Sequence, residues 1–139
     1  MIFFLYSVSF LSAQFPVHQI NSIHPSEGDE FGTDVSISGD KIAISSPRNN
    51  DNGMHSGSVE VYSVADGVWI HDAKIHGSDA SFFDHFGYSI ALEGSTLAVG
   101  APNHNAKGPR SGAVYIFEHS SEFGWVEKQN LIPDDLSGG

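Results

Sequence analysis

FGTDVSISGDKIAISSP, at residues 31–47, returns 55 residues later as FGYSIALEGSTLAVGAP at residues 86–102. The match continues at the same offset, from SGSVEVY at 56–62 to SGAVYIF at 111–117. A fixed period of this size indicates a repeat architecture, in which one unit cannot bury its apolar surface without its neighbours. Fold and function are therefore sought in the unit.

The charge and the cysteine content of the chain exclude some classes of binding partner and of site. The 139 residues carry a net charge of −11 from 6 basic and 17 acidic side chains, and the basic residues do not cluster. Such a surface is a poor partner for nucleic acid or for an anionic membrane. There is no cysteine, which excludes a disulfide framework and a thiolate metal site.

Short stretches of each unit alternate between apolar and polar residues. A period of two, rich in β-branched residues and bounded by Gly, Asp and Ser, predicts strands. Between the first two strands, Gly39 and Gly94 favour two-residue hairpins, because glycine adopts positive φ without steric cost. The alternating positions are Val35/Ile37, Ile42/Ile44 and Val59/Val61, then Ile90/Leu92, Leu97/Val99 and Val114/Ile116.

The second strand of each unit is expected to end at Pro47 or Pro102, since proline lacks the amide donor of a ladder. A loop then leads to Gly57 or Gly112 and the third strand. After a polar turn, a fourth strand is predicted to begin at a tryptophan. One inserted residue changes the offset to 56 here, so that Trp69 pairs with Trp125.

Each unit is thus predicted to form four antiparallel strands. One such sheet cannot cover its own faces, whereas radial stacking packs each sheet against the next. The expected fold class is all-β: a partial β-propeller with two four-stranded antiparallel blades plus one N-terminal strand of a neighbouring blade.

The residues also resemble a known family. Phe31-Gly32 and Phe86-Gly87, followed by a strand and then Gly100-Ala101-Pro102, are similar to the signatures of FG-GAP repeats, known from the integrin α-subunit propeller and from many secreted or surface proteins. The first unit departs from the pattern, with Ser45-Ser46-Pro47 in place of the full signature. The resemblance covers about residues 15–135 and implies propeller blades on a secreted or cell-surface protein.

The boundaries follow from the repeat. We expect a lone strand of an incomplete blade at 14–24, blades at 25–77 and 78–133, and the start of a connector to a missing blade at 134–139. Propellers have typically 4–8 blades, so we expect a fragment that pairs with further blades of the same full-length protein, with self-assembly of short chains as the alternative.

Residues 1–13 form an apolar run ending in Ser12-Ala13. The run suits the apolar core of a secretory signal and is too short for a spanning helix. We therefore expect a signal peptide, and the alternative is an apolar strand of an earlier repeat.

The resemblance does not carry over a calcium site. Integrin-type repeats that bind Ca²⁺ place an Asp-rich loop between the first two strands, whereas this chain has only Gly39-Asp40 and Gly94-Ser95 there. Asn49 and Asp51 are weak metal candidates in the next loop. The counterpart of that loop, at 103–108, has a lysine and no carboxylate. We expect no calcium and no other cofactor.

No catalytic residue is predicted. The acids before the Phe-Gly pairs are expected to cap the connectors by accepting backbone N–H bonds, and the repeat-equivalent aromatics to pack between blades. The histidines show no closely spaced ligand pair, and most are expected to be exposed. The acids are Asp29, Asp79, Asp84 and Asp135. The repeat-equivalent aromatics are Phe31, Phe86, Tyr62, Phe117, Trp69 and Trp125. The histidines are His18, His24, His55, His71, His76, His85, His104 and His119.

The expected function is that of a non-enzymatic extracellular scaffold that binds a protein or carbohydrate. Loops 48–56 and 103–111 are equal in length but unlike in sequence. This is expected where the scaffold residues are kept and the surface residues are free to vary. The alternatives are part of a propeller-based hydrolase or lyase, or a purely structural repeat of a large surface protein.

Overall fold

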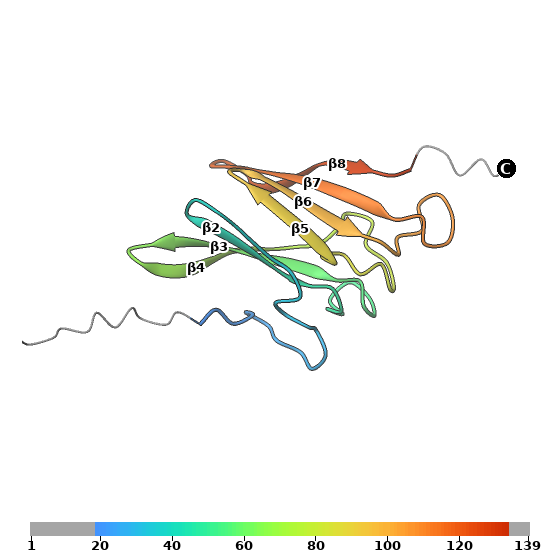
Figure 1. Cartoon of the computed structure of the whole chain (residues 1–139), viewed down its shortest axis with the longest axis horizontal. Coiled ribbons are helices and arrows are strands. Elements are labelled where there is room, and N and C mark those ends of the chain that lie inside the picture. Colours follow the sequence, from blue (N-terminus) through green and yellow to red (C-terminus); the bar gives the residue numbers. More distant parts are fainter. Residues whose placement is uncertain (1–18, 134–139) are drawn as a thin grey trace, which may run out of the picture.

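The computed structural model describes residues 19–133, which form two four-stranded antiparallel sheets and no helix. It therefore contains no helix that could cross a membrane within that range. Figure 1 shows the two sheets face to face, each in simple order along the chain. The expected signal at 1–13 and the connector at 134–139 lie outside the described residues. Blade A contains β1 (Val35–Ser38), β2 (Lys41–Ser46), β3 (Ser58–Ala65) and β4 (Val68–Ile75), and blade B contains β5 (Ser89–Glu93), β6 (Thr96–Ala101), β7 (Ala113–Ser120) and β8 (Gly124–Leu131).

The prediction of an all-β partial propeller is confirmed. β2 and β6 end directly before Pro47 and Pro102, and β4 and β8 begin one residue before the tryptophans. Residues 19–24 form no strand here, because a strand needs a paired neighbour. The lone strand expected at 14–24 therefore stays a prediction.

The hairpin turns explain the change of offset within the repeat. Gly39 and Gly94 have φ of 58° and 56°, as two-residue turns of the primed kind require. Asp66 and Gly67 both have positive φ in a two-residue turn of blade A. In blade B three residues, 121–123, precede Gly124 at φ 67°. The longer turn absorbs the inserted residue without disturbing the strands.

The core lies between the two blades. Ala43, Val59 and Val61 of blade A share one buried cluster with Leu97 and Val99 of blade B. Phe86 belongs to the same cluster and is only 1% exposed, with its ring edge-on to the rings of Tyr115 and Phe117 at 5.2 and 6.0 Å. Packing between blades is thus confirmed for Phe86 and Phe117. Trp125 is partly buried and packs against the cluster as well.

A ladder of side-chain acceptors joins the inner strands of the two blades. Oxygens of Asp34, Ser36 and Ser38 accept hydrogen bonds from backbone N–H groups on and just after β5. The donors are Ile90, Leu92 and Gly94, at 2.7, 2.9 and 2.9 Å. Because β5 is the edge strand of its sheet, these bonds satisfy amides that would otherwise lack a protein partner.

The backbones come closest where Gly57 meets Phe86. The two residues form a parallel bridge, and the Phe86 N–H donates to the Ser56 carbonyl at 2.9 Å. A Cβ on Gly57 would lie 2.1 Å from the Phe86 carbonyl oxygen, so no side chain fits there. The equivalent Gly112 has φ +79°, and the nearest atom to a Cβ there is the Pro102 oxygen at 3.5 Å.

The outer faces of the two blades stay partly uncovered. Val35 and Ile37 of blade A are 49% and 62% exposed, whereas their equivalents in blade B, Ile90 and Leu92, pack into the core between the blades. Within residues 19–133, the same positions thus pack into the core where the other blade faces them and are exposed where no blade does.

Candidate functional site

The connections between strands gather at two ends of the molecule. Hairpins 39–40, 66–67, 94–95 and 121–123 form one end, which we call the hairpin rim. The opposite end, the loop rim, holds the long connections 25–34, 47–57, 76–88 and 102–112. Figure 1 shows the two rims at opposite ends of the sheets. Side chains that are free to vary without disturbing strand pairing are found mainly on the loop rim.

Two buried acids organise the loop rim, one in each unit. Asp29 accepts from the Ser26 N–H at 3.2 Å and from the Asn49 amide at 3.1 Å. Asp84 occupies the equivalent place and accepts from the Ser81 N–H at 2.8 Å. The predicted capping role is confirmed for Asp29 and Asp84, and it is wrong for Asp79, which accepts from the side chains of Tyr115 and Asn130 instead of from backbone N–H groups. Their buried side-chain partners were not predicted.

In blade B the partner of Asp84 is a histidine. His104 is 5% exposed, with Nδ1 3.0 Å from Asp84 and Nε2 3.4 Å from Asp79. Asp79 also accepts from the Tyr115 hydroxyl at 2.5 Å and from Asn130 at 3.2 Å. Burial, and then the hydrogen bond to Asp79, raise the pKa of Tyr115, so this hydroxyl stays protonated. The cluster therefore holds the connector to blade B and presents no activated nucleophile.

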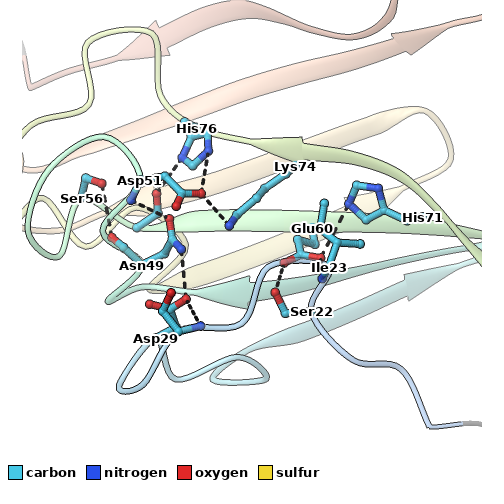
Figure 2. Close-up of polar contacts among 12 residues, drawn as sticks. Ser22, Ile23, Asp29, Asn49, Asp51, Ser56, Glu60, His71, Lys74 and His76 are labelled. Carbon is cyan, nitrogen blue, oxygen red and sulfur yellow. Dashed lines mark hydrogen bonds and ion pairs between the residues drawn. The ribbon is translucent and has the colours of Figure 1, made fainter.

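The weak metal candidates Asn49 and Asp51 lie in one loop, and one side-chain oxygen of each already has a partner within the protein. Asn49 accepts from the Asp51 N–H at 3.1 Å, and the Asp51 carboxylate lies 2.6 Å from the Lys74 ammonium (Figure 2). The hydrogen bond to Lys74 lowers the pKa of Asp51. Within residues 19–133 no three His, Asp or Glu side chains are grouped as metal ligands.

A buried carboxylate also fastens the start of the described chain to blade A. Glu60 on β3 is 1% exposed and accepts from the Ser22 hydroxyl, the Ile23 N–H at 3.2 Å and the Tyr62 hydroxyl at 2.6 Å. Figure 2 shows this anchor, with His71 Nε2 3.6 Å away. Burial, with Glu60 beside it, raises the pKa of Tyr62. The site is a structural anchor between residues 38 apart in sequence.

The expectation that most histidines are exposed is wrong for the described residues. His24 is exposed, His104 is buried, and His55, His71, His76, His85 and His119 are half-buried. His71 and His76 contact different acids, Glu60 and Asp51, and do not form a pair. Acids on other strands and loops partner His71, His76 and His104, whereas His55, His85 and His119 pack on neighbouring rings. His18 and Asp135 lie outside the described residues.

The loop rim contains a groove of about 330 Å³ between the connector 76–88 and the loop 102–112. Two exposed rings, Phe82 and Phe83, stand on one side at 65% and 49% exposure. We call this the rim groove, and it is lined by Phe82, Phe83, His85, Asn103, Asn105, Pro109 and Arg110.

Hydrogen bonds hold the polar wall of the rim groove in place. The Asn103 amide lies 2.7 Å from His85 Nδ1, and the side-chain oxygen of Asn105 accepts from the Arg110 N–H at 2.8 Å. The His85 ring stacks on His55 at 5.8 Å. Burial, and then the neighbouring His55 and Arg48, lower the pKa of His85. The groove thus offers apolar rings, amides and one guanidinium.

Sequence reasoning pointed to loop 103–111 but missed the connector residues Phe82 and Phe83. A signal was present in the repeat itself. Phe83 occupies the position of Gly28, and both have positive φ, 64° and 86°. Aligning the two units shows this difference, because a phenylalanine in the second unit replaces a glycine in the first.

Comparison with known proteins places the chain in a family. No curated protein matches it at a significant level. The family model of the FG-GAP repeat matches residues 22–62 and 69–117, which is well over half of the chain. The first match covers β1, β2 and part of β3, and the second begins on β4 of blade A and runs through β5 and β6 into β7. The chain therefore belongs to the FG-GAP repeat family.

Proposed function

We propose that the chain is a segment of a non-enzymatic, extracellular or cell-surface propeller that acts as a binding scaffold and presents its loop rim to a protein or carbohydrate. One observation carries the proposal: the two units share a scaffold but differ on this rim. Glu27, Gly28 and Arg48 of the first unit are replaced by Phe82, Phe83 and Asn103 in the second. A large exposed aromatic pair beside amides is a common feature of recognition surfaces.

The buried acids support the non-enzymatic part of the proposal. Asp29, Asp84 and Glu60 each accept hydrogen bonds from groups that hold the chain together. Catalytic acids need an approach for substrate and a pKa suited to proton transfer, and these three carboxylates are buried in the scaffold. The ion pair of Asp51 with Lys74 supports function without calcium, because an ammonium group occupies the carboxylate that a cation would need.

The open faces of the blades support further blades of the same protein as the structural partners. The apolar side chains on these faces, such as Ile37 at 62% exposure, correspond to buried positions at the contact between the blades. The net charge of −11 supports a partner other than nucleic acid.

A loop exchange tests the proposal. Residues 103–110 of the full chain are replaced by the equivalent 48–55, which has the same length and the same flanking scaffold. The control replaces the hairpin-rim turn 121–123 by Asp-Gly. Both variants and the parent are applied to an immobilised extracellular-matrix preparation and to its deproteinised glycan fraction.

We expect the parent and the turn variant to bind one of the two surfaces, and the loop exchange to abolish that binding. Binding that survives the loop exchange, or that is lost equally in the turn variant, contradicts a role for the loop rim. Chemical turnover of the bound material, followed by mass spectrometry, contradicts the non-enzymatic proposal and favours the alternative of a propeller enzyme.

A further inference from the structure

We infer that the rim groove binds an acidic saccharide, a sugar chain that carries a uronic-acid carboxylate. The inference rests on the proposed binding function and names the ligand class of the same rim. Four observations support it: the backbone of Phe83, the exposure of both rings, the charge of loop 102–112 and the hydrogen bonds of the connector backbone.

Phe83 occupies a conformation that the scaffold requires and that phenylalanine does not favour. The equivalent residue of the first unit is Gly28, with φ +86° and no atom within 4 Å of the place where a Cβ would lie. Phe83 has φ 64°, which for a bulky residue is an outlier. Glycine would satisfy the same backbone without strain, so the ring is not explained by the fold. Backbone strain of this kind is concentrated at functional sites.

The two rings are placed to receive a sugar. Phe82 lies over Gly53, with ring carbons 3.4 Å from the position of a Cβ there, and stays 65% exposed. Phe83 is held edge-on to His55 at 5.3 Å and stays 49% exposed. A pyranose presents an apolar C–H face that packs on such rings and an edge of hydroxyls that bonds to amides. Asn103 and Asn105 supply those amides across the groove.

The charge of the groove favours an acidic ligand over a neutral one. In a chain of net charge −11, the loop 102–112 contains Lys107 and Arg110 and no acid. Within residues 19–133 the Arg110 guanidinium makes no ion pair. A guanidinium pairs with a carboxylate through two parallel hydrogen bonds. Arg110 therefore binds the carboxylate of the sugar.

A peptide ligand is disfavoured by the backbone of the connector. The N–H groups of Phe83 and His85 donate to the carbonyls of Met54 and His55 at 2.8 and 3.1 Å. An extended peptide gains affinity by pairing with free main-chain groups, and these two donors are already used. Side-chain recognition of a sugar needs no such pairing.

The test titrates the full chain by calorimetry with three probes: a hyaluronan hexasaccharide, the neutral chitohexaose and hexaglutamate. Variants are Arg110→Gln, Phe83→Gly and the control Phe123→Ser. Phe123 is 71% exposed on the hairpin rim, so its removal alters an exposed ring away from the groove. Melting temperatures are recorded for every variant.

We expect hyaluronan to bind and chitohexaose to bind at least about tenfold more weakly, because a hydrogen bond between charged groups is stronger than one between neutral groups. Arg110→Gln should remove that difference. Phe83→Gly should abolish binding while its melting temperature stays equal to that of the parent or rises by a few degrees, because strain is relieved. Phe123→Ser should bind as the parent does.

Three results overturn the inference: no binding of hyaluronan, equal binding of hexaglutamate, or binding unchanged in Phe83→Gly. If matrix proteins still bind through loop 103–110 in the loop-exchange experiment, the scaffold function stands and the saccharide assignment alone is wrong.

Discussion

Replacing Gly57 with alanine tests the close approach that joins the blades. The new Cβ would lie 2.1 Å from the Phe86 oxygen, 2.6 Å from its nitrogen and 2.8 Å from its carbonyl carbon. All three are backbone atoms, so relief requires the connector to move. That movement breaks the Phe86 N–H bond to Ser56 and the neighbouring bond from His85 to His55. It also disturbs the Phe86 ring, which is 1% exposed.

The magnitude follows from these losses. Alanine at positive φ costs about 1 kcal/mol, two backbone hydrogen bonds about 1–3 kcal/mol, and partial loss of a buried aromatic contact about 1 kcal/mol or more. We expect Gly57→Ala to lower the free energy of unfolding by about 3–5 kcal/mol. Gly112→Ala should cost only the strain, about 1 kcal/mol, because its φ is similar but the nearest atom to its Cβ is 3.5 Å away.

The assay is urea unfolding of the full chain, followed by the fluorescence of Trp69 and Trp125. Both variants place alanine at a positive φ, so the difference between their free energies of unfolding excludes this shared backbone strain. If Gly57→Ala and Gly112→Ala are equally stable, within about 0.5 kcal/mol, the close approach does not join the blades and the reasoning is refuted.

Ser36→Ala should cost about 1 kcal/mol and speed hydrogen exchange of the Leu92 amide, because that N–H loses its acceptor; unchanged exchange would show that the ladder is not formed in solution. Glu60→Gln should cost about 2–3 kcal/mol and speed proteolysis within residues 19–24, since an amide nitrogen replaces one of the two carboxylate oxygens, of which one accepts from Ser22 and the other from Ile23. Equal cleavage rates would argue against the anchor. The pKa of His85 is lowered in the folded protein, so as pH falls below about 6.5 the unfolded chain gains a proton that the folded chain does not, and stability declines. His85→Gln should lose less stability between about pH 7.5 and 5.5, and an equal loss in both proteins would contradict this assignment.

The strands and turns were predictable because their signals are local. Alternation at Val59 and Val61 has a period of two, and Gly39 marks its own turn, so neither depends on distant residues. The repeat added the order of the strands and the packing of Phe86 between blades. Features that depend on a short stretch of sequence, or on the 55-residue repeat, could therefore be predicted.

The buried polar contacts could not be predicted because their partners are distant and do not repeat. Glu60 occupies the position of Tyr115, and Asn49 that of His104, so the units place different chemistry on one scaffold. His104 was expected at the surface since polarity alone suggested exposure, whereas Asp84 supplies its buried partner. The rim groove is not predicted from the sequence, because its rings lie on the connector 76–88, for which the repeat indicates only a scaffold role.

The acceptor ladder between β1 and β5 also bears on how such a chain can evolve. Its acceptors are Asp34, Ser36 and Ser38, and the corresponding residues of the second unit are Ser89, Ala91 and Glu93. Alanine has no acceptor, so a tandem duplication of the second unit would set two copies together with the middle bond missing. The order of the units therefore limits which duplications and exchanges of units keep all three hydrogen bonds. The acceptor residues of the first unit are matched to the unit that follows it.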